Sequence, residues 1–333
     1  MPSHNNPRKS IFKKSVEPEK REFCIGYDFE KGLEFWKFLD SLYYTGFQAT
    51  NLGKAIRLAK KMRKEKATIF FGFTSNVISC GLREAVTFLV KNKLVHITVT
   101  TVGGVEEDII KTHKPFILGY FGADGGELRK KGINRTGNIF IPNERYIWFE
   151  KFMQPLMKRL LEKQKTRGKI VNALEFVKEC GKELENYPNK ETSYIYWAYK
   201  NNIPVFCPGL TDGSLGDMIY FFKKEHPEFK VDISDDIVSM NDMALNAEKT
   251  GAIIIGGSLP KHHIMNANMF REGADYTIYI NTAIEEDGSN AGARPEEAKS
   301  WGKAVADENE VKVWGEATLV FPLLVAGAFV QKK

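Results

Sequence analysis

The sequence predicts an α/β fold of three layers, α/β/α, in which a mainly parallel sheet is covered by helices on both faces. Short runs that are apolar throughout alternate with longer segments of helical period. Strands that are buried on both faces have this composition, and parallel strands need helical crossovers between them. With 43% hydrophobic residues in a length of 333, the chain can also bury an extensive core.

The predicted strands follow one another from a start near residue 25. They are residues 67–73, 94–100, 115–121, 203–209, 251–257, 275–280 and 311–314. Residues 1–22 are polar and basic and have no apolar period, so we expect a flexible arm there. Residues 23–333 are predicted to form a single domain.

Charge and cysteine content narrow the classes of function. The net charge is +6, but 48 basic residues are interleaved with 42 acidic ones, so nucleic-acid binding is not expected. The four cysteines are far apart and form no CxxC pair, which disfavours a disulfide framework or a zinc knuckle. The first residues lack the apolar core of a signal peptide, and the longest apolar run, 317–330, is short and contains Pro322. We therefore expect a soluble cytoplasmic protein without membrane contacts.

Polar loops follow most of the predicted strands. These loops are residues 74–79, 100–108, 210–217, 256–263, 281–290 and 314–317, and they are rich in Gly, Ser, Thr and acidic residues. Open α/β sheets bind ligands at the carboxyl ends of their strands, so the loops predict a site at that edge. No GxGxxG or P-loop sequence is present. A nucleotide would have to be held by stretches such as "TSNVIS" and "TTVGG". Taken alone, "TSNVIS" is more typical of an ordinary capped helix, and "TTVGG" is also typical of a tight turn.

The same loops concentrate acidic residues: Glu106, Glu107, Asp108, Asp212, Asp217, Glu285, Glu286, Asp287, Glu296 and Glu297. Converging carboxylates would form a negative pocket that suits a polycation. A metal is not expected, because the nearby histidines are the adjacent His262 and His263, which do not easily face one ion. For Asp108 and Glu296 we favour the plainer role of acids that stabilise the start of their own helix.

Two side chains could carry chemistry. One residue of the pair His262 and His263 is expected to pack or cap while the other faces a ligand. Lys303 follows Trp301 and Gly302, and spacing alone favours an ordinary exposed lysine, because only about one lysine amine in a thousand is unprotonated at neutral pH. Desolvation against Trp301 or a base such as His262 could offset this.

The chain resembles the deoxyhypusine synthase family. The resemblance rests on "TGFQATNLGKAI", "TSNVISCGLREAV", "TTVGGVEEDIIK", "GINRTGNIFIPNERY", "NIPVFCPGLTDGSLGDMI", "GGSLPKHHIMNANM" and "YINTAIEEDGSNAGARPEEAKSWGK", and it runs from about residue 25 to 331. It implies a sirtuin-like, Rossmann-type fold that binds NAD without GxGxxG. It also implies a homotetramer with active sites at subunit interfaces, and an N-terminal arm that can cover a neighbouring site.

The implied activity is NAD-dependent transfer of the 4-aminobutyl group of spermidine to one lysine of the translation initiation factor 5A precursor. The catalytic residues implied are Lys303, which forms an imine with the butylamine group, and His262, which takes a proton from spermidine. The implied NAD contacts are Ser75, Asn76, Val77, Ile78, Ser79, Thr101, Val102, Gly103, Glu107, Asp212, Gly257, Thr282, Ala283, Glu316 and Ala317. The implied spermidine contacts are Glu106, Glu107, Asp217, His262, Gly288, Ser289, Asn290, Glu297, Trp301 and Lys303.

Two positions depart from the pattern of the family. Asn290 stands where an aspartate is expected among the polyamine contacts, and Glu316 stands where Asp is more usual near NAD. Two alternatives stay open: a homospermidine synthase-like enzyme that uses putrescine as acceptor, and a catalytically silent regulatory paralogue. A sirtuin-type deacylase is disfavoured, because the sequence lacks its four-cysteine zinc module.

Overall fold

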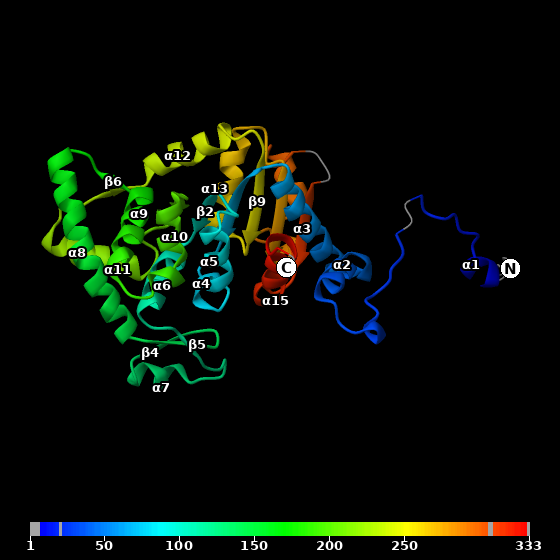
Figure 1. Ribbon diagram of the computed structural model, residues 1–333, viewed down its shortest axis with the longest axis horizontal. Helices are drawn as coiled ribbons and strands as arrows, with labels where there is room; N and C mark the ends of the chain where they lie inside the picture. The colour runs from blue at the N-terminus through cyan, green and yellow to red at the C-terminus, as the bar shows by residue number, and fades with distance from the viewer. Residues whose placement is uncertain (1–6, 20–21, 306–308, 332–333) are drawn as a thin grey trace, which may run out of the picture.

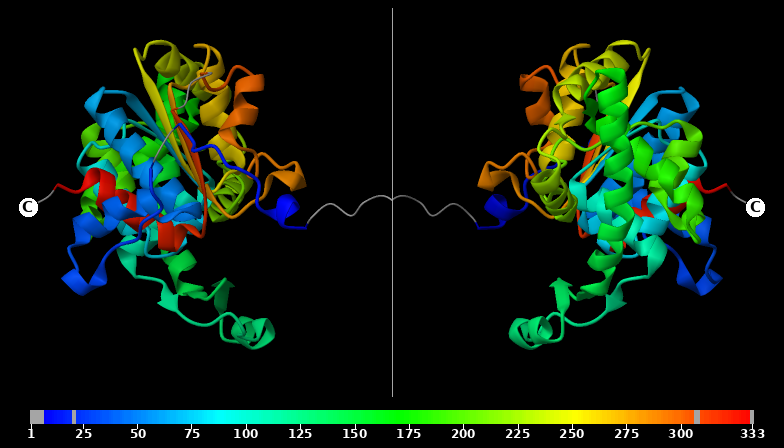
Figure 2. Two further views of the ribbon diagram at one scale, coloured as in Figure 1. Left: turned by 90° about the vertical axis from the view of Figure 1, so that its right-hand side faces the viewer. Right: turned by 90° about the vertical axis from the view of Figure 1, so that its left-hand side faces the viewer.

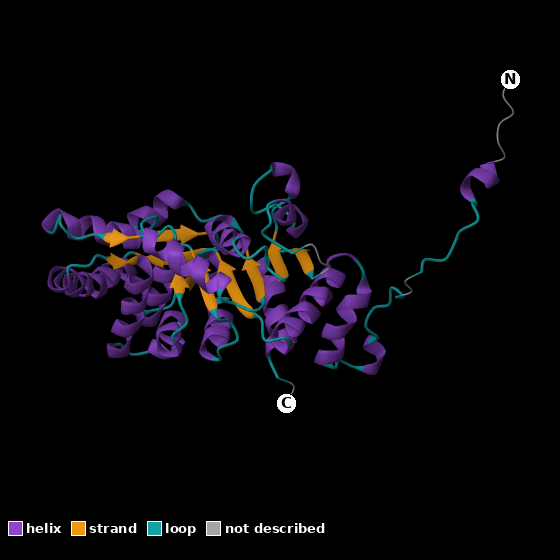
Figure 3. Cartoon of the chain, turned by 90° about the horizontal axis from the view of Figure 1, so that it is seen from above, coloured by secondary structure: helices purple, strands orange, loops and turns teal. Residues whose placement is uncertain are grey.

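A parallel sheet organises the molecule. The computed structural model of the chain describes residues 7–19, 22–305 and 309–331. Six strands form one sheet in the order β11-β10-β9-β1-β2-β7, and every pairing in it is parallel, which confirms the predicted fold class. The strands are β1 Thr68–Phe73, β2 Ile97–Thr100, β7 Val205–Phe206, β9 Thr250–Ile255, β10 Tyr276–Asn281 and β11 Glu310–Trp314. Figure 3 shows this sheet with helices on both sides.

Helices cover the two faces unequally. One face carries the larger set, with further helices packed beyond the β7 edge: α3 Phe47–Lys64, α4 Asn76–Ser79, α5 Arg83–Lys91, α6 Val102–His113, α8 Glu144–Arg167, α9 Ala173–Glu183, α10 Tyr194–Asn201, α11 Ser214–Glu225 and α15 Ala317–Phe329. The opposite face carries α12 Ser234–Leu245, α13 Ser258–Met269 and α14 Pro295–Ser300. Figure 1 shows α3 and α15 on one side of β9 and α8 at the far left of the view, beyond α9, α10 and α11; α3 contacts β11 and β10.

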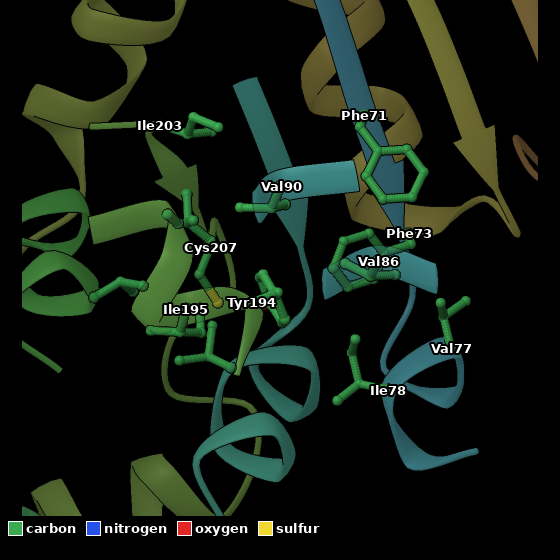
Figure 4. Close-up of a cluster of buried hydrophobic side chains, with 14 of the residues drawn as sticks. Phe71, Phe73, Val77, Ile78, Val86, Val90, Tyr194, Ile195, Ile203 and Cys207 are labelled. Atoms are coloured by element: carbon green, nitrogen blue, oxygen red, sulfur yellow. The ribbon is translucent and has the colours of Figure 1, made fainter. Parts of the chain in front are cut away.

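Side chains that point alternately to the two faces of the sheet build two hydrophobic cores, one on each face. In β1, Ile69, Phe71 and Phe73 belong to the larger core, whereas Phe70 belongs to the smaller core beneath α13. Successive strand side chains point to opposite faces, so a strand that is apolar at every position packs on both. Figure 4 shows part of the larger core, where Phe71 and Phe73 lie close to Val86 of α5.

The prediction of a main-sheet strand at residues 115–121 was wrong. Only Ile117–Leu118 form a strand, β3, and it belongs to an antiparallel sheet with β5 Ile139–Pro142 and β4 Ile133–Thr136. Leu118 is 81% exposed, so the apolar run does not enter the core. Together with α7 Gly125–Lys130 these strands form a lobe that projects from the body in Figure 2.

The remaining elements lie at the periphery. Parallel β6 Val171–Asn172 and β8 Val231–Asp232 make a two-stranded sheet, and α2 Phe35–Thr45 packs on α3. The described part of the chain contains four 3-10 turns, Phe29–Lys31, Leu184–Asn186, Lys190–Thr192 and Glu285–Asp287. The predicted arm includes residues 1–6 and 20–21, which lie outside the described residues, and its short helix α1 Pro7–Ile11 lies away from the body in Figure 1. Among the described residues, no helix combines the length and apolar character that crossing a membrane requires.

Candidate active site

The strand order places the expected ligand crevice between β1 and β9. From β1 the chain proceeds outward through β2 and β7, then returns to β9 on the other side of β1 and continues to β10 and β11. The strand order therefore reverses at β1 and β9, and ligands of open α/β sheets bind at such a point, outside the carboxyl ends of the strands. Gly256, directly after β9, has a φ of +89°, and a Cβ there would come 2.9 Å from Thr74 Oγ1 after β1. The two loops thus meet at the predicted edge.

The segment after β1 is held by the start of α6. The backbone N–H of Ser75 donates to Thr101 Oγ1 at 3.0 Å, and the two hydroxyl oxygens are 2.5 Å apart. Gly103 is required there, since a Cβ would lie 2.6 Å from Ser75 Oγ. Asn76 remains exposed at the crevice. Side chains of Val77, Ile78 and Val102 are buried in the larger core, so only their backbone can face a ligand.

Three consecutive acids of α6 hold three different elements. Glu106 Oε2 accepts from the backbone N–H of Leu215 at 2.6 Å, at the start of α11. Glu107 accepts from the hydroxyl of Ser79 at the end of α4. Asp108 Oδ1 accepts from Arg83 Nε at 2.6 Å, and its Oδ2 accepts from Ile195 N–H at 3.1 Å, near the start of α10. The expectation that Asp108 stabilises its own helix was wrong, because it lies in the second turn of α6 and serves α10 instead.

Burial changes the titration of these acids. It raises the pKa of Glu107 to about 7, with the charge of Glu106 acting in the same direction and the Ser79 hydroxyl opposing it. Burial also raises the pKa of Glu106, which Asp217 and Asp212 increase further. Both carboxyls are less than 10% exposed. Glu107 is therefore partly protonated near neutral pH, and Glu106, Asp212 and Asp217 form one electrostatic group beside α11.

The two histidines of α13 differ in burial. His262 is exposed, whereas His263 is half-buried and its Nε2 is buried with no hydrogen-bond partner among the described residues. Burial, and then the charge of Lys303, lowers the pKa of His262 below its ordinary value. The imidazole of His262 is consequently neutral at pH 7 and free to accept a proton.

Lys303 lies beyond α14, close to His262. It is half-buried, and its Nζ lies 5.2 Å from the ring centroid of Trp301. Its carbonyl accepts from Ala274 N–H at 3.0 Å, which ties this turn to the start of β10. Glu297 and Trp301 are exposed beside it. Lys303 is thus half-buried rather than fully exposed, and its amine lies near the Trp301 ring and the His262 imidazole.

The loop from 282 to 294 is fastened by two lysines. Lys261 Nζ donates to the carbonyls of Asn290 at 2.6 Å and Ala293 at 2.8 Å. Lys312 Nζ donates to the carbonyl of Ala283 at 2.9 Å and to that of Gly292. Thr282 also receives a bond from Trp314 Nε1 at 2.9 Å. The loop exposes Gly288 and Ser289 next to α13. Neither Lys261 nor Lys312 was predicted to have a role, although Lys261 lies within "GGSLPKHHIMNANM".

Glu316 takes a role that the sequence pattern did not suggest. Its carboxylate accepts from the Thr318 N–H at 2.9 Å and from the Thr318 hydroxyl, which caps α15. Its charge contributes to the raised pKa of Cys80, after burial, so α15 starts close to the end of α4. Ala317 is the first residue of that helix. Gly257 packs on Ala291, because a Cβ at Gly257 would lie 2.5 Å from Ala291 Cβ.

Comparison with known proteins agrees with this geometry. The family model described as deoxyhypusine synthase matches residues 37–328. That match spans most of the chain. The chain belongs to the deoxyhypusine synthase family.

Relatives from distant organisms support the assignment. A probable deoxyhypusine synthase of Pyrococcus furiosus is 51% identical over 330 residues, which cover 96% of this chain and 97% of the relative. One of Methanocaldococcus jannaschii is 54% identical over 84% of this chain and 88% of its own length. The deoxyhypusine synthase of Senecio vernalis is 46% identical, with coverage of 98% and 95%. A crystal structure described as a deoxyhypusine synthase of Entamoeba histolytica matches with a TM-score of 0.67 and 32% identity over 92% of this chain and 96% of that one. The chain is accordingly a transferase of an NAD-dependent family.

Proposed function

We propose that the chain transfers the 4-aminobutyl group of spermidine to a lysine of the translation initiation factor 5A precursor, with Lys303 as the covalent carrier. The observation that carries this proposal is the pairing of Lys303 with His262. The amine lies against Trp301, and its charge acts on an exposed imidazole that is neutral at pH 7. An imidazole in this state can accept the proton that a substrate amine loses beside Lys303.

The crevice fits NAD. The glycine at 103 and the positive φ of Gly256 allow a close approach to the backbone on both sides of the switch point. Asn281 Oδ1, at the end of β10, is buried and accepts no hydrogen bond within the described residues. Its amide nitrogen donates to the Gly256 carbonyl at 3.1 Å, so the free oxygen lies beside the crevice. Residues 75–79, Thr101, Gly103, Asp212, Gly257, Thr282, Ala283, Glu316 and Ala317 would hold the dinucleotide.

The chemistry that NAD would supply when bound is removal of a hydride from the carbon next to the secondary amine of spermidine and its return to that carbon at the end of the cycle. His262 accepts the proton that the amine loses in the oxidation. Lys303 attacks the resulting carbon–nitrogen double bond, so that an imine forms on Lys303 and 1,3-diaminopropane leaves. The acceptor lysine then displaces Lys303 from the imine carbon. Each displacement exchanges one amine for another, so Lys303 is regenerated.

Carboxylates and an indole would position the polyamine. Asp217 and Glu297 are exposed, and Trp301 is 63% exposed beside Lys303. Ammonium groups of spermidine would meet the carboxylates, and the indole would cover the reacting end. We propose that these groups act across subunits of a homotetramer, since Asp217 lies on α11, which packs on α6 and α8, whereas Lys303 lies in the turn after α14, which packs on β10 and β11. An exposed indole of this kind is suited to a partner surface.

We further propose that the protein acts in the cytoplasm as a single domain whose N-terminal arm covers a neighbouring site.

An acceptor assay tests the proposal. Spermidine labelled in the butylamine moiety is incubated with NAD, the enzyme and either the factor 5A precursor or putrescine. Label is expected in the protein acceptor. Label in putrescine alone would identify a homospermidine synthase-like enzyme, and absence of label in both acceptors would indicate a catalytically silent paralogue.

A further inference from the structure

One face of α6 is built to hold the segment after β1. Gly103, Glu107 and Lys111 are spaced four residues apart, so they lie on the same side of the helix. This side faces α4, with which α6 makes close contact. Gly103 packs on Ser75 at the start of the segment, and Glu107 accepts from the Ser79 hydroxyl near its end. Lys111 lies on the same side of α6, one turn beyond Glu107.

Lys111 uses its whole ammonium group on this segment. Its Nζ donates to the carbonyls of Ile78 at 2.7 Å, Ser79 at 2.9 Å and Cys80 at 3.0 Å. A lysine has three N–H donors and no acceptor, so all of its hydrogen-bonding capacity is satisfied. Carbonyls at the end of a helix carry partial negative charge, which a cation stabilises. Burial lowers the pKa of Lys111, and the cost of that burial is offset by these contacts.

The segment has little else to define its end. α4 contains four residues, and the chain leaves it through Cys80, which is extended. Val77 and Ile78 point into the core, where Figure 4 shows them near Phe73 and Val86. The core therefore fixes the inner side of the segment. The carbonyls of Ser79 and Cys80 converge on Lys111, and loss of the ammonium would leave them facing one another without a donor.

We propose that Lys111 is a positioning residue for the dinucleotide, acting through the segment from Ser75 to Cys80. The inference rests on the proposed function only in taking residues 75–79 as NAD contacts. Lys111 itself lies behind α4 and touches its carbonyls, so it acts on the ligand through Ser75 and Asn76. Among the described residues, the hydrogen bonds of the Lys111 ammonium go to the carbonyls of Ile78, Ser79 and Cys80, none of which is a proposed spermidine contact, so we expect the effect on the dinucleotide first.

The test is titration of the purified enzyme with NADH, followed by NADH fluorescence, in parallel with steady-state kinetics. Lys111→Met keeps the length of the side chain and removes the charge and the donors. We expect the Kd for NADH to rise ten- to a hundredfold, whereas the KM for spermidine at saturating NAD stays within about twofold. The matched control is Lys114→Met, an exposed lysine at the end of the same helix whose Nζ lies 3.6 Å from Glu144. It should bind NADH as the wild type does.

An unchanged Kd for NADH in folded Lys111→Met overturns the proposal, and so does an equal rise in the Kd for NADH and the KM for spermidine. If Lys111→Met is recovered unfolded, Lys111→Gln replaces it, because the amide keeps two donors without a charge, and the same selective rise is expected. The binding measurement does not depend on turnover. A wild-type chain that binds NADH but transfers no label contradicts the proposed function, whereas an active chain whose Lys111 variants bind NADH normally contradicts only this inference.

Discussion

The Lys261 ammonium donates to the carbonyl of Asn290 at 2.6 Å. Lys261 is 3% exposed and lies 4.3 Å from the centroid of the Tyr279 ring, and burial lowers its pKa to about 8. The next residue is His262, so one turn of α13 both fastens the loop that carries Asn290 and presents the imidazole. The proposed spermidine contacts on that loop are therefore set at a fixed position relative to the proposed base.

Asn290→Asp is expected to tighten spermidine binding. The Asn290 amide donates to the carbonyl of Ser258 at 3.2 Å, a weak contact at an exposed position, and an aspartate would replace it with a charge that faces the polyamine. The KM for spermidine should fall about three- to tenfold, which corresponds to roughly 0.6–1.4 kcal/mol, with the KM for NAD unchanged. Asn290→Ser, which removes the amide without adding charge, should not lower the KM. Equal effects of the two variants would exclude the electrostatic explanation.

His262 should define the acid limb of the pH profile. Burial and the Lys303 charge lower its pKa, so the neutral form persists below the ordinary pKa of about 6.5, and kcat/KM should rise with pH through a value below that. His262→Gln should lose this limb and about 10²–10⁴-fold in kcat. His263→Gln, on the next residue, should retain the limb. If His262→Gln still shows the acid limb of the pH profile, the limb reports the titration of a different group, and the prediction is contradicted.

Glu107 should make the stability of the protein fall as pH rises. Its folded pKa of about 7 exceeds the unfolded value of about 4.3, so the folded state binds more protons between these values and the free energy of unfolding decreases with pH. Glu107→Gln keeps an acceptor for Ser79 and removes the titration. Relative to the variant, the wild type should lose about 2–3 kcal/mol between pH 5 and pH 8 in urea unfolding. Parallel pH curves for the two proteins would show that Glu107 titrates normally.

Asp108→Asn should destabilise the fold strongly. Asp108 is fully buried, and the substitution would leave the Arg83 guanidinium, whose side chain is 5% exposed, without its counter-charge. Removal of one partner from a buried ion pair costs about 3–5 kcal/mol. Glu84→Gln, an exposed acid on the same helix as Arg83, is the control and should change the free energy of unfolding by less than about 0.5 kcal/mol. A loss below about 1 kcal/mol in Asp108→Asn would mean that water or the amide replaces the pair.

The sheet and its ligand edge could be predicted because both depend on local pattern. Runs such as 67–73 and 251–257 are apolar at every position, and parallel strands bring their carboxyl ends to one edge. The run 115–121 looks similar, but it begins with Pro115, Gly119 interrupts it, and it packs in a lobe where Leu118 meets solvent. Periodicity does not distinguish an apolar run in the core from one on a projecting lobe.

The site could be predicted in part. Loop position indicated that one of His262 and His263 would face a ligand, and the structure shows His262 exposed. The partners of Glu106 and Asp108 were not predictable from the sequence. Each carboxylate accepts from a backbone N–H near the start of a helix far along the chain, and only the tertiary fold brings that helix to α6. Lys111 could have been found, because its spacing from Gly103 and Glu107 marks one face of a predicted helix.

The central claim is that Lys303 carries the butylamine group, and borohydride trapping tests it most directly. The enzyme is incubated with NAD and labelled spermidine, reduced with borohydride, digested and analysed by mass spectrometry. We predict a reduced aminobutyl adduct on Lys303 that is absent from Lys303→Arg. The control is Lys299→Arg, because the ammonium of Lys299 pairs with Glu296 at 2.7 Å, and this variant should carry the adduct at the wild-type level. An adduct on a different lysine, or one that persists in Lys303→Arg, would contradict the account.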